Sequence, residues 1–530
     1  MLLAAALLLS APGWAAVSGE IAGDTVWEGT VDVDGVVRVA KGATLLVAPG
    51  TTVRFAPGAD EANQHRSRLV VAGILVAQGS ADAPVRFVSA AERPGKGDWG
   101  GISLEHARER PSRISHAVIA NAAAAITGSY SVLYAEDLRI EGSLRGIVSL
   151  QDFHGRLLRG TLSGNDVGLT YYQNSTFHVE GSEVRGGSGG GIECLRGSSP
   201  AIRSSSILDN GPRGITAAQG SSPLIEGNTI RGHEQGIFLQ LQCRPRIVRN
   251  AITGNGAGIW GEKFIFAEIA GNEITRNGTG IYCNFSAYPT IRGNNIHGNT
   301  GFGIVLGDNM SFVMEKRIPF RMGGQFSFTP PQEPTVLPPQ TRRFTPLPAV
   351  EEGVVDAREN WWGAEAVAEM TRVGANGNSA AIEDFYDKPD TWYEDATYRR
   401  DRVAFAPWEA QPVAGAGPPK GVVPGVRGTV VLEGQPVGGV RVHAYADADG
   451  GFRGQGQAFS APSARDGSFA LDLAPGSYHL VAKGPATLFP HAEPRKGDLY
   501  GSCGGNPVTV GASEGAAVSE GIGIVVRKVE

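Results

Sequence analysis

One short run carries the pattern that recurs along this chain: Gly280-Ile281-Tyr282-Cys283-Asn284-Phe285. Apolar residues alternate at positions 281, 283 and 285, and Gly or Asn lies on each side of the run. Alternation with a period of two is typical of a β-strand with one buried face, and helical heptads are absent. The run therefore predicts a short strand with Ile281 and Cys283 pointing inward.

Ile281 belongs to a repeat with a spacing of about 22 residues, which indicates one structural unit per repeat. Its members are Ile102, Ile126, Ile147, Leu169, Ile192, Ile215, Ile237, Ile259, Ile281 and Ile304. Asn-x-Ile units that begin at Asn228, Asn250, Asn272 and Asn294 recur in the same register. Short strands separated by Gly and Asn turns predict an all-β fold, a right-handed single-stranded parallel β-helix. Each repeat would be one rung, and rungs stack about 4.8 Å apart.

The Asn residues at fixed offset have a structural explanation. Asn tolerates the left-handed backbone conformation that a corner requires, and its amide can stack on copies above and below. We therefore expect this column to support the fold and not to carry chemistry.

The ends of the repeat region resemble a known family. The succession of 50–53, 73–79, 83–87 and 98–102 is similar to the opening of bacterial secreted right-handed β-helix proteins, in the pectate-lyase-like superfamily. Asn360-Trp361-Trp362-Gly363, with 384–387 and 405–408 after it, resembles their closing rung. The resemblance covers about residues 21–410. It implies the fold and no activity, because such helices serve as lyases, hydrolases, epimerases, adhesins and scaffolds.

Composition agrees with an extracellular β protein. The chain has 530 residues, of which 75 are Gly and 32 Pro, and 41% hydrophobic residues suffice for a continuous core. The net charge is −6, and Arg is interspersed with Asp and Glu. A nucleic-acid binder would carry a basic stripe, so we expect no nucleic-acid partner.

Residues 1–16 are interpreted as a signal peptide, with an apolar stretch from Leu2 to Leu9 and small residues at Gly13 and Ala15. The stretch is too short to span a bilayer, and we expect no transmembrane segment elsewhere. No Cys follows the apolar stretch, which argues against a lipid anchor. The expected location is the periplasm, the cell surface or the medium.

The remaining chain divides into further parts. The β-helix is predicted over 17–410, with its closing rung and cap at 354–410, a linker at 411–425 and a second domain at 426–530. Eight prolines fall within 308–350, so this segment is interpreted as an excursion out of the helix. It is either a decoration or a flap over one face.

The second domain is predicted to be a small antiparallel β-sandwich. Its expected strands are 428–432, 440–445, 468–473 and 477–482, with hairpin turns at Asp466-Gly467 and Pro475-Gly476. Their order resembles the carboxypeptidase regulatory-like family, a transthyretin-like fold, which implies an accessory module and not a peptidase. The run 447–450 is interpreted as a plain turn and not a calcium loop. We predict no metal and no cofactor.

The four cysteines are predicted to be free and buried. Cys194 and Cys283 each follow a repeat residue by two positions, so they face inward four rungs apart. That separation is about 19 Å by stacking, which is beyond disulfide reach. Cys243 lies at a different offset, and Cys503 lies in the second domain.

One face of the predicted β-helix offers a binding surface. The residue after each repeat Ile points outward, and in four successive rungs it is Thr216, Phe238, Trp260 and Tyr282. Gln240, Glu262 and Asn284 lie two positions further along, also outward. Aromatic rings beside amides and a carboxylate are suited to sugars. Two alternatives stay open: the 308–350 excursion covers the stripe, or the rings reflect simple sheet-face preference.

Catalysis has weaker support in the sequence. Related enzymes carry clustered carboxylates, and the phased rungs contain no Asp-Asp pair. The nearest constellation is Glu262-Lys263 with Asp308, and a solvated ion pair also explains the first two. We therefore expect a secreted, non-enzymatic envelope or extracellular protein that binds a polysaccharide or a cell-surface partner. The alternatives are a polysaccharide lyase or hydrolase, and a structural spacer.

Overall fold

A computed structural model describes residues 16–58, 67–108, 110–173, 175–308, 353–393 and 396–419. It also describes residues 425–529 apart from 446–447, 449–451, 453–457, 461–462, 474–475, 485–495 and 512–517. The expected signal peptide and nearly all of the expected excursion lie outside the described residues. The chain divides into two compact units, Met1–Pro418 and Pro419–Glu530, and each is described by itself.

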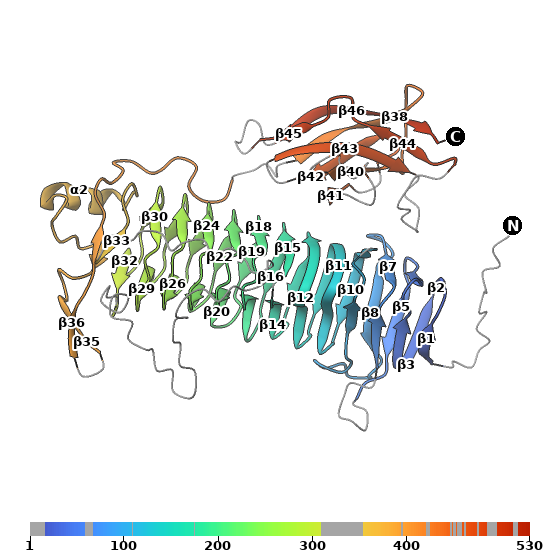
Figure 1. The fold of residues 1–530 in the computed structure, drawn as a ribbon, viewed down its shortest axis with the longest axis horizontal. Helices are drawn as coiled ribbons and strands as arrows, with labels where there is room; N and C mark the ends of the chain where they lie inside the picture. Colours follow the sequence, from blue (N-terminus) through green and yellow to red (C-terminus); the bar gives the residue numbers. More distant parts are fainter. Residues whose placement is uncertain are drawn as a thin grey trace, which may run out of the picture. The chain divides into compact units, whose positions relative to one another are not determined.

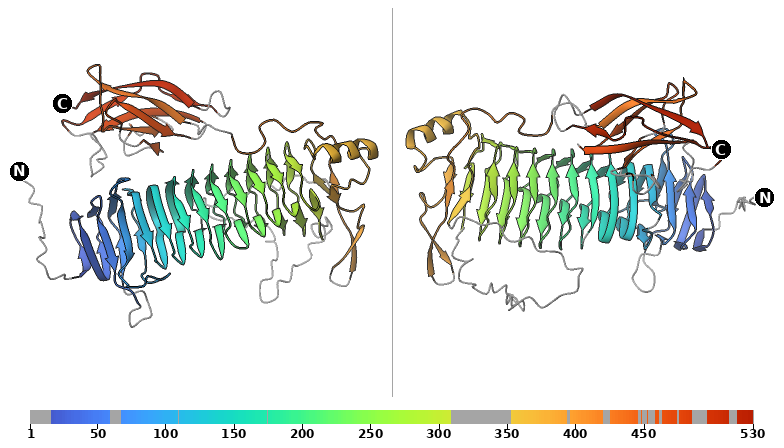
Figure 2. Two further views of the ribbon diagram at one scale, coloured as in Figure 1. Left: turned by 180° about the vertical axis from the view of Figure 1, so that it is seen from behind. Right: turned by 45° about the horizontal axis from the view of Figure 1, so that its top comes forward.

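The first unit is a right-handed parallel β-solenoid of about 13 turns, which confirms the predicted fold class (Figure 1). Its strands form three columns, which Figure 2 shows from two further sides. Every pairing between strands of these columns is parallel, as a chain that coils in one direction requires.

The first column carries the Ile repeat. Its strands are β6 (Arg68–Val71), β9 (Ile102–Glu105), the first parts of β11 (Ala124–Glu141) and β12 (Arg145–Leu158), β14 (Val167–Tyr171), β17 (Gly190–Cys194), β20 (Arg213–Ala218), β23 (Gln235–Gln240), β26 (Ala257–Glu262), β29 (Thr279–Asn284), β32 (Ile304–Leu306) and β34 (Ile382–Glu383). The end of β3 (Thr30–Val39) pairs with β6 at the start of this column.

The other two columns complete each rung. The second contains β2 (Thr25–Trp27), β4 (Thr44–Val47), β7 (Ile74–Gln78), parts of β10 (Ser112–Ala120), β11 and β12, then β15 (Thr176–Glu180), β18 (Ala201–Arg203), β21 (Leu224–Glu226), β24 (Arg246–Val248), β27 (Glu268–Ala270), β30 (Thr290–Arg292), β33 (Val354–Asp356) and β37 (Arg402–Ala404). The third contains the start of β3, β5 (Thr52–Phe55), β8 (Val85–Ser89), the last parts of β10 and β11, β13 (Thr161–Ser163), β16 (Glu183–Arg185), β19 (Ser206–Leu208), β22 (Thr229–Arg231), β25 (Ala251–Thr253), β28 (Glu273–Thr275) and β31 (Asn295–His297). Strand β1 (Val17–Ile21) pairs with β3, and β35 (Asp390–Tyr393) pairs with β36 (Ala396–Arg399).

The ten predicted repeat residues form one buried column in register. Ile281, for example, pairs with Ile259 on one side and Ile304 on the other. The column continues beyond the predicted members, because Val37 and Leu69 precede Ile102 and Ile382 follows Ile304. The buried column is the spine of the hydrophobic core.

The predicted Asn column is a continuous hydrogen-bond ladder. Each Asn donates a hydrogen bond of 2.9 to 3.0 Å from its Nδ2 to Oδ1 of the next Asn in the column, beginning at Asn228 and continuing through Asn250, Asn272 and Asn294. The last acceptor is Asn360, and all five side chains are buried. The predicted stacking of the amides is confirmed, because buried amides are stable only when their polar atoms are paired. The left-handed backbone conformation expected of these Asn residues is wrong: the residue before each of them, Gly227, Arg249, Gly271 or Gly293, adopts it instead.

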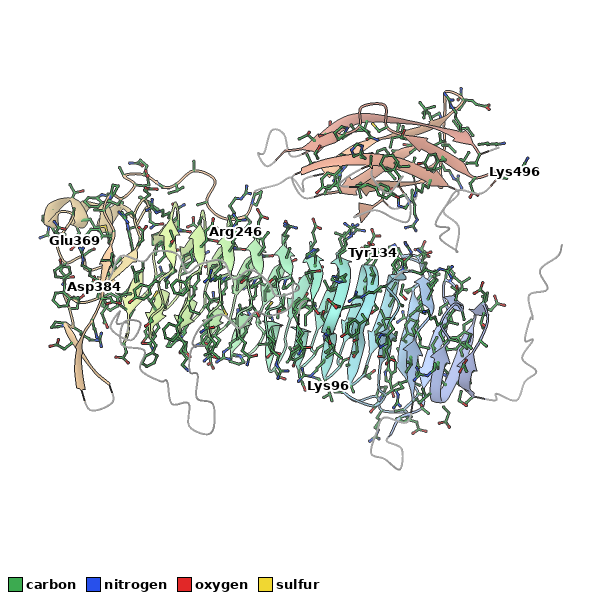
Figure 3. All side chains as sticks on the ribbon, viewed as in Figure 1. Lys96, Tyr134, Arg246, Glu369, Asp384 and Lys496 are labelled. Carbon is green, nitrogen blue, oxygen red and sulfur yellow. The ribbon has the colours of Figure 1, made fainter. Side chains whose placement is uncertain are left out.

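The residues after Asn360 close the end of the core. Trp362 is 3% exposed and belongs to the core cluster, as does Met370 on α2 (Ala364–Val373). This is the one helix in the described part of the chain. Figure 3 labels Glu369 on this helix and Asp384 nearby, at the same end of the solenoid.

The second unit is a mixed sheet, which corrects the prediction of a purely antiparallel one. Its strands are β38 (Gly425–Leu432), β39 (Gln435–Pro436), β40 (Arg441–Tyr445), β41 (Ala458–Phe459), β42 (Ser468–Asp472), β43 (Gly476–Gly484), β44 (Leu499–Ser502), β45 (Val508–Val510) and β46 (Val518–Lys528). Strand β46 pairs with β38 in parallel, because the last strand returns beside the first in the same direction. No strand was predicted after residue 482, so this pairing could not be foreseen.

The two expected hairpins are also wrong. Strand β42 pairs with β38, whereas β41 before it pairs with β40 and β43 after it pairs with β40, β44 and β45. The turn at Gly467 therefore joins strands that do not pair with each other. Local turn chemistry predicted a change of direction correctly but not the partner of each strand.

All four cysteines are free and buried. The register places Cys194 and Cys283 in one inward column, with three rungs between them. Burial raises the pKa of the Cys283 thiol to about 12, so this thiol stays protonated and unreactive at neutral pH.

Candidate functional site

The outward face of the first column holds the predicted aromatic stripe. Thr216, Phe238, Trp260 and Tyr282 are direct neighbours in register, and Val305 follows them. The rings of Trp260 and Tyr282 stack with centroids 4.0 Å apart and planes 19° apart. Both side chains are half-buried, so part of each ring is open to a ligand.

Phe238 was expected to face solvent, and the structure contradicts this. The residue is only 4% exposed, because the guanidinium of Arg213 lies over its ring at 3.8 Å. Arg213 is held there by a hydrogen bond of 3.0 Å from its Nε to Oε1 of Gln235. The exposed aromatic stripe therefore consists of Trp260 and Tyr282 alone.

The position of the Tyr282 ring depends on a glycine in the next rung. A Cβ atom placed on Gly307 would lie 2.2 Å from Oη of Tyr282, which no side chain can occupy. The phenol therefore lies directly against the backbone at the end of β32. One face of Tyr282 covers Trp260 and its hydroxyl end lies over Gly307.

Glu262 is the centre of a hydrogen-bond network beside the stack. Its Oε1 accepts a hydrogen bond of 2.6 Å from Nε2 of Gln240 and forms an ion pair of 3.3 Å with Nζ of Lys263. Its Oε2 accepts a hydrogen bond of 3.3 Å from Nε1 of Trp260. The network brings four of the predicted residues together around the carboxylate of Glu262.

Asn284 is the neighbour of Glu262 in register, and it contacts the backbone of Asp308. The side chain of Asn284 is buried, and its Oδ1 accepts a hydrogen bond of 2.7 Å from the backbone N–H of Asp308. Asn284 therefore positions the backbone and does not face a ligand. The carboxylate of Asp308 is 42% exposed and forms an ion pair of 3.6 Å with Nη2 of Arg400.

Sequence reasoning missed Arg400, which lies between β36 and β37. Its Nη1 donates a hydrogen bond of 3.3 Å to the carbonyl of Leu306, and its side chain is only 12% exposed. No repeat or motif marks this residue, and the chain returns to the solenoid over a long sequence distance. Only the three-dimensional structure brings Arg400 to Tyr282.

The environment of Tyr282 keeps its phenol protonated. Burial raises the pKa of Tyr282, and the nearby carboxylates of Asp308, Glu383 and Glu262 raise it further, while Arg400 opposes them. Glu383 is itself paired with Lys388 at 2.7 Å. The hydroxyl is therefore a neutral group that can donate and accept hydrogen bonds at neutral pH.

Apart from this face, a hollow with a volume of about 590 Å³ lies beside α2. Its lining includes His297, Trp361, Gly363 and Glu369, and none of the predicted site residues. Nε2 of His297 is paired with Oε1 of Glu273 at 2.6 Å. In the described part of the chain, no group of three or more His, Cys, Asp or Glu residues could hold a metal ion.

Comparisons with known proteins agree with the fold. The family model described as "Right handed beta helix region" matches residues 145–264 and 224–318. Together with the strand register, this match defines the class of protein: a right-handed parallel β-helix. A search of curated proteins found no match. Among the described residues, no helix has the length and hydropathy needed to span a bilayer.

Two solved structures are similar to this chain. One is the periplasmic alginate epimerase AlgG, at 15% identity and a TM-score of 0.44, with 52% of this chain and 74% of that chain covered. The other is the A-module of the mannuronan C-5 epimerase AlgE6 of Azotobacter vinelandii, at 16% identity and a TM-score of 0.36, with 51% and 86% covered. At these TM-scores neither structure carries an argument about activity.

Proposed function

We propose that the solenoid binds a carbohydrate on the outward face of β23, β26 and β29, without transforming it. The single observation that carries this proposal is the partly exposed stack of Trp260 on Tyr282 beside the carboxylate of Glu262. Aromatic rings with polar groups at their edges are typical of sites that hold sugar rings by CH-to-π contacts and hydrogen bonds.

The site is organised before any ligand arrives. Gln240, Lys263 and Trp260 fix Glu262, and Gly307 lets Tyr282 lie flat against the backbone. A rigid site loses little conformational entropy on binding, so even a small contact area can yield measurable affinity.

A glycan array tests the proposal directly. We expect the protein to bind at least one glycan, and Trp260→Ala to weaken that binding at least tenfold. Tyr130→Ala is the matched control, because Tyr130 forms a similar stack with His106 at 5.2 Å, six rungs away and about 29 Å along the axis. Absence of binding by the unmodified protein, or equal loss in both variants, would refute the proposal.

The same samples test the alternatives. Incubation with neutral and uronic-acid polysaccharides should yield no new reducing ends and no unsaturated products. If such products appeared, the protein would be a lyase or a hydrolase and not a binding protein. Glu262, Lys263 and Asp308 would then be the first residues to mutate. Complete absence of both binding and products would favour a structural spacer.

We further propose that the protein is exported and that its second unit is a carboxypeptidase regulatory-like accessory module. The apolar stretch from Leu2 to Leu9 supports export, and the strand-and-turn order of 428–482 supports the module. Mass spectrometry of the protein from cell fractions would test the export, because a processed chain should begin near Val17.

A further inference from the structure

The charges around Tyr282 are balanced in pairs. Lys263 pairs with Glu262 at 3.3 Å, Arg400 with Asp308 at 3.6 Å, and Lys388 with Glu383 at 2.7 Å. Glu383 lies in the same outward column as Tyr282, with Val305 between them. Three cations and three carboxylates therefore cancel at this end of the face.

The cations at this end of the face are committed to carboxylates, although Lys263 and Lys388 are more exposed, at 24% and 57%, than Glu262 and Glu383, at 16% each. Glu262 accepts a hydrogen bond from Nε1 of Trp260, so its carboxylate lies at the edge of the aromatic stack. Arg400 is only 12% exposed and its Nη1 is bound to a backbone carbonyl. Lys263 is bound to Glu262, so an acidic ligand against Trp260 would have to compete with Glu262 for that cation, and like charges at short range repel.

Arg213 is a further cation on this face, two rungs from Trp260. Its guanidinium lies flat on the ring of Phe238, and its Nε donates to Gln235. This side chain acts as a cover for the Phe238 ring. Its fixed contacts leave it poorly oriented for a bidentate contact with a carboxylate beside Trp260.

The groups that remain for a ligand suit hydroxyls. Glu262 is an acceptor at the edge of the stack and is bound to the Gln240 amide, and the Tyr282 hydroxyl lies over Gly307. The raised pKa of Tyr282 supports this picture, because a protonated phenol can both donate to and accept from a sugar hydroxyl.

We propose that the ligand class of this site is an uncharged polysaccharide. The inference rests on the proposed function, since it specifies the carbohydrate that the Trp260–Tyr282 face binds. Recognition is by stacking on the two rings and by sugar hydroxyls that donate to Glu262. Carboxylate or sulfate groups on the ligand are disfavoured by Glu262 and Asp308.

The experiment compares uncharged, uronic-acid and sulfated glycans on one array, at about 50 and about 300 mM NaCl, followed by titration of the best binder in each group. We expect an uncharged glycan to bind at least tenfold more tightly than any acidic glycan of the same length. We also expect its Kd to change less than twofold between the two salt concentrations, because no net charge is neutralised on binding. Acidic glycans that bind more tightly, or a strong loss of affinity with salt, would overturn the inference and leave the proposed function intact. Failure to bind any glycan would remove the proposed function itself.

Two variants sharpen the test. Glu262→Gln should narrow the preference for uncharged over acidic glycans at least threefold, because it removes the repelling charge and keeps the polar shape. Arg213→Gln should leave the affinity for the uncharged glycan within twofold. If Arg213→Gln instead abolished binding while the fold persisted by circular dichroism, the ligand would depend on that cation and the inference would fail.

Discussion

Gly307 shows how one residue sets the geometry of the site. The Tyr282 hydroxyl occupies the space that a side chain at position 307 would need. A methyl group there must displace the phenol or the backbone, and either movement disturbs the stack on Trp260.

We predict that Gly307→Ala weakens glycan binding at least tenfold. Gly261→Ala is the control, because a Cβ atom at Gly261 meets only side-chain carbons at 3.7 Å, an ordinary contact. Binding isotherms and thermal melts of both variants would check this. Equal affinity in the two variants would show that the Tyr282 position is not important.

His178 gives the solenoid a dependence of stability on pH. Burial lowers the pKa of His178 to about 4, with Arg203, His154 and Arg156 lowering it further. In the unfolded chain the pKa returns to about 6.5, so between pH 6.5 and pH 4 the unfolded state binds more protons. The stability of the fold therefore falls as the pH drops through this window, by up to about 3 kcal/mol.

We predict that the Tm of the protein decreases between pH 7 and pH 4 and that His178→Gln flattens this decrease. The Nδ1 atom of His178 accepts a hydrogen bond of 3.0 Å from the backbone N–H of Ala201, which a Gln oxygen can replace. Calorimetry at several pH values is the measurement. Parallel Tm curves for the two proteins would contradict the assignment.

At the scale of the element, the Asn ladder links successive rungs through buried side chains. Asn272 donates to Ile247, Ala270 and Asn294, and it accepts two hydrogen bonds from Asn250. Removing this side chain leaves several buried groups without partners, each at a cost of about 1–3 kcal/mol.

We predict that Asn272→Ala destabilises the solenoid by about 3 kcal/mol or more. Arg246→Gln is the control, because its ion pair with Glu268 is exposed and worth less than about 1 kcal/mol (Figure 3). Thermal melts should show a marked decrease in Tm for the first variant and almost none for the second. A small change in both would mean that the ladder is not needed.

The elements with a strict period were the ones that sequence could predict. Every rung from Ile102 to Ile304 and the Asn column followed from local alternation and spacing. The rungs at Leu69 and Ile382 do not follow the spacing of about 22 residues. The burial of Phe238 depends on a contact with Arg213 of the neighbouring rung. Long-range contacts of this kind leave no periodic signal in a single sequence.

At the scale of the whole molecule, the two units have separate hydrophobic cores. The core of the first unit runs from Trp27 to Phe405, and that of the second from Val426 to Val526. Each core is complete without residues from the other, which is the condition for independent folding.

We predict that a chain ending at Pro418 folds and keeps its glycan affinity within twofold. The binding residues all precede this point, and Arg400 is retained. Circular dichroism and the same binding titration would check the outcome. Loss of binding by a folded, shortened chain would assign part of the site to the second unit.

The pairing of Ile304 with Ile382 has a consequence for how this protein can vary. The stack continues across that step although the chain between the two residues is long. The solenoid thus has a junction where length is uncoupled from register. Lineages, or protein engineers, could exchange the sequence between Asp308 and Gly353 for a segment of another size while the rungs on either side keep their alignment.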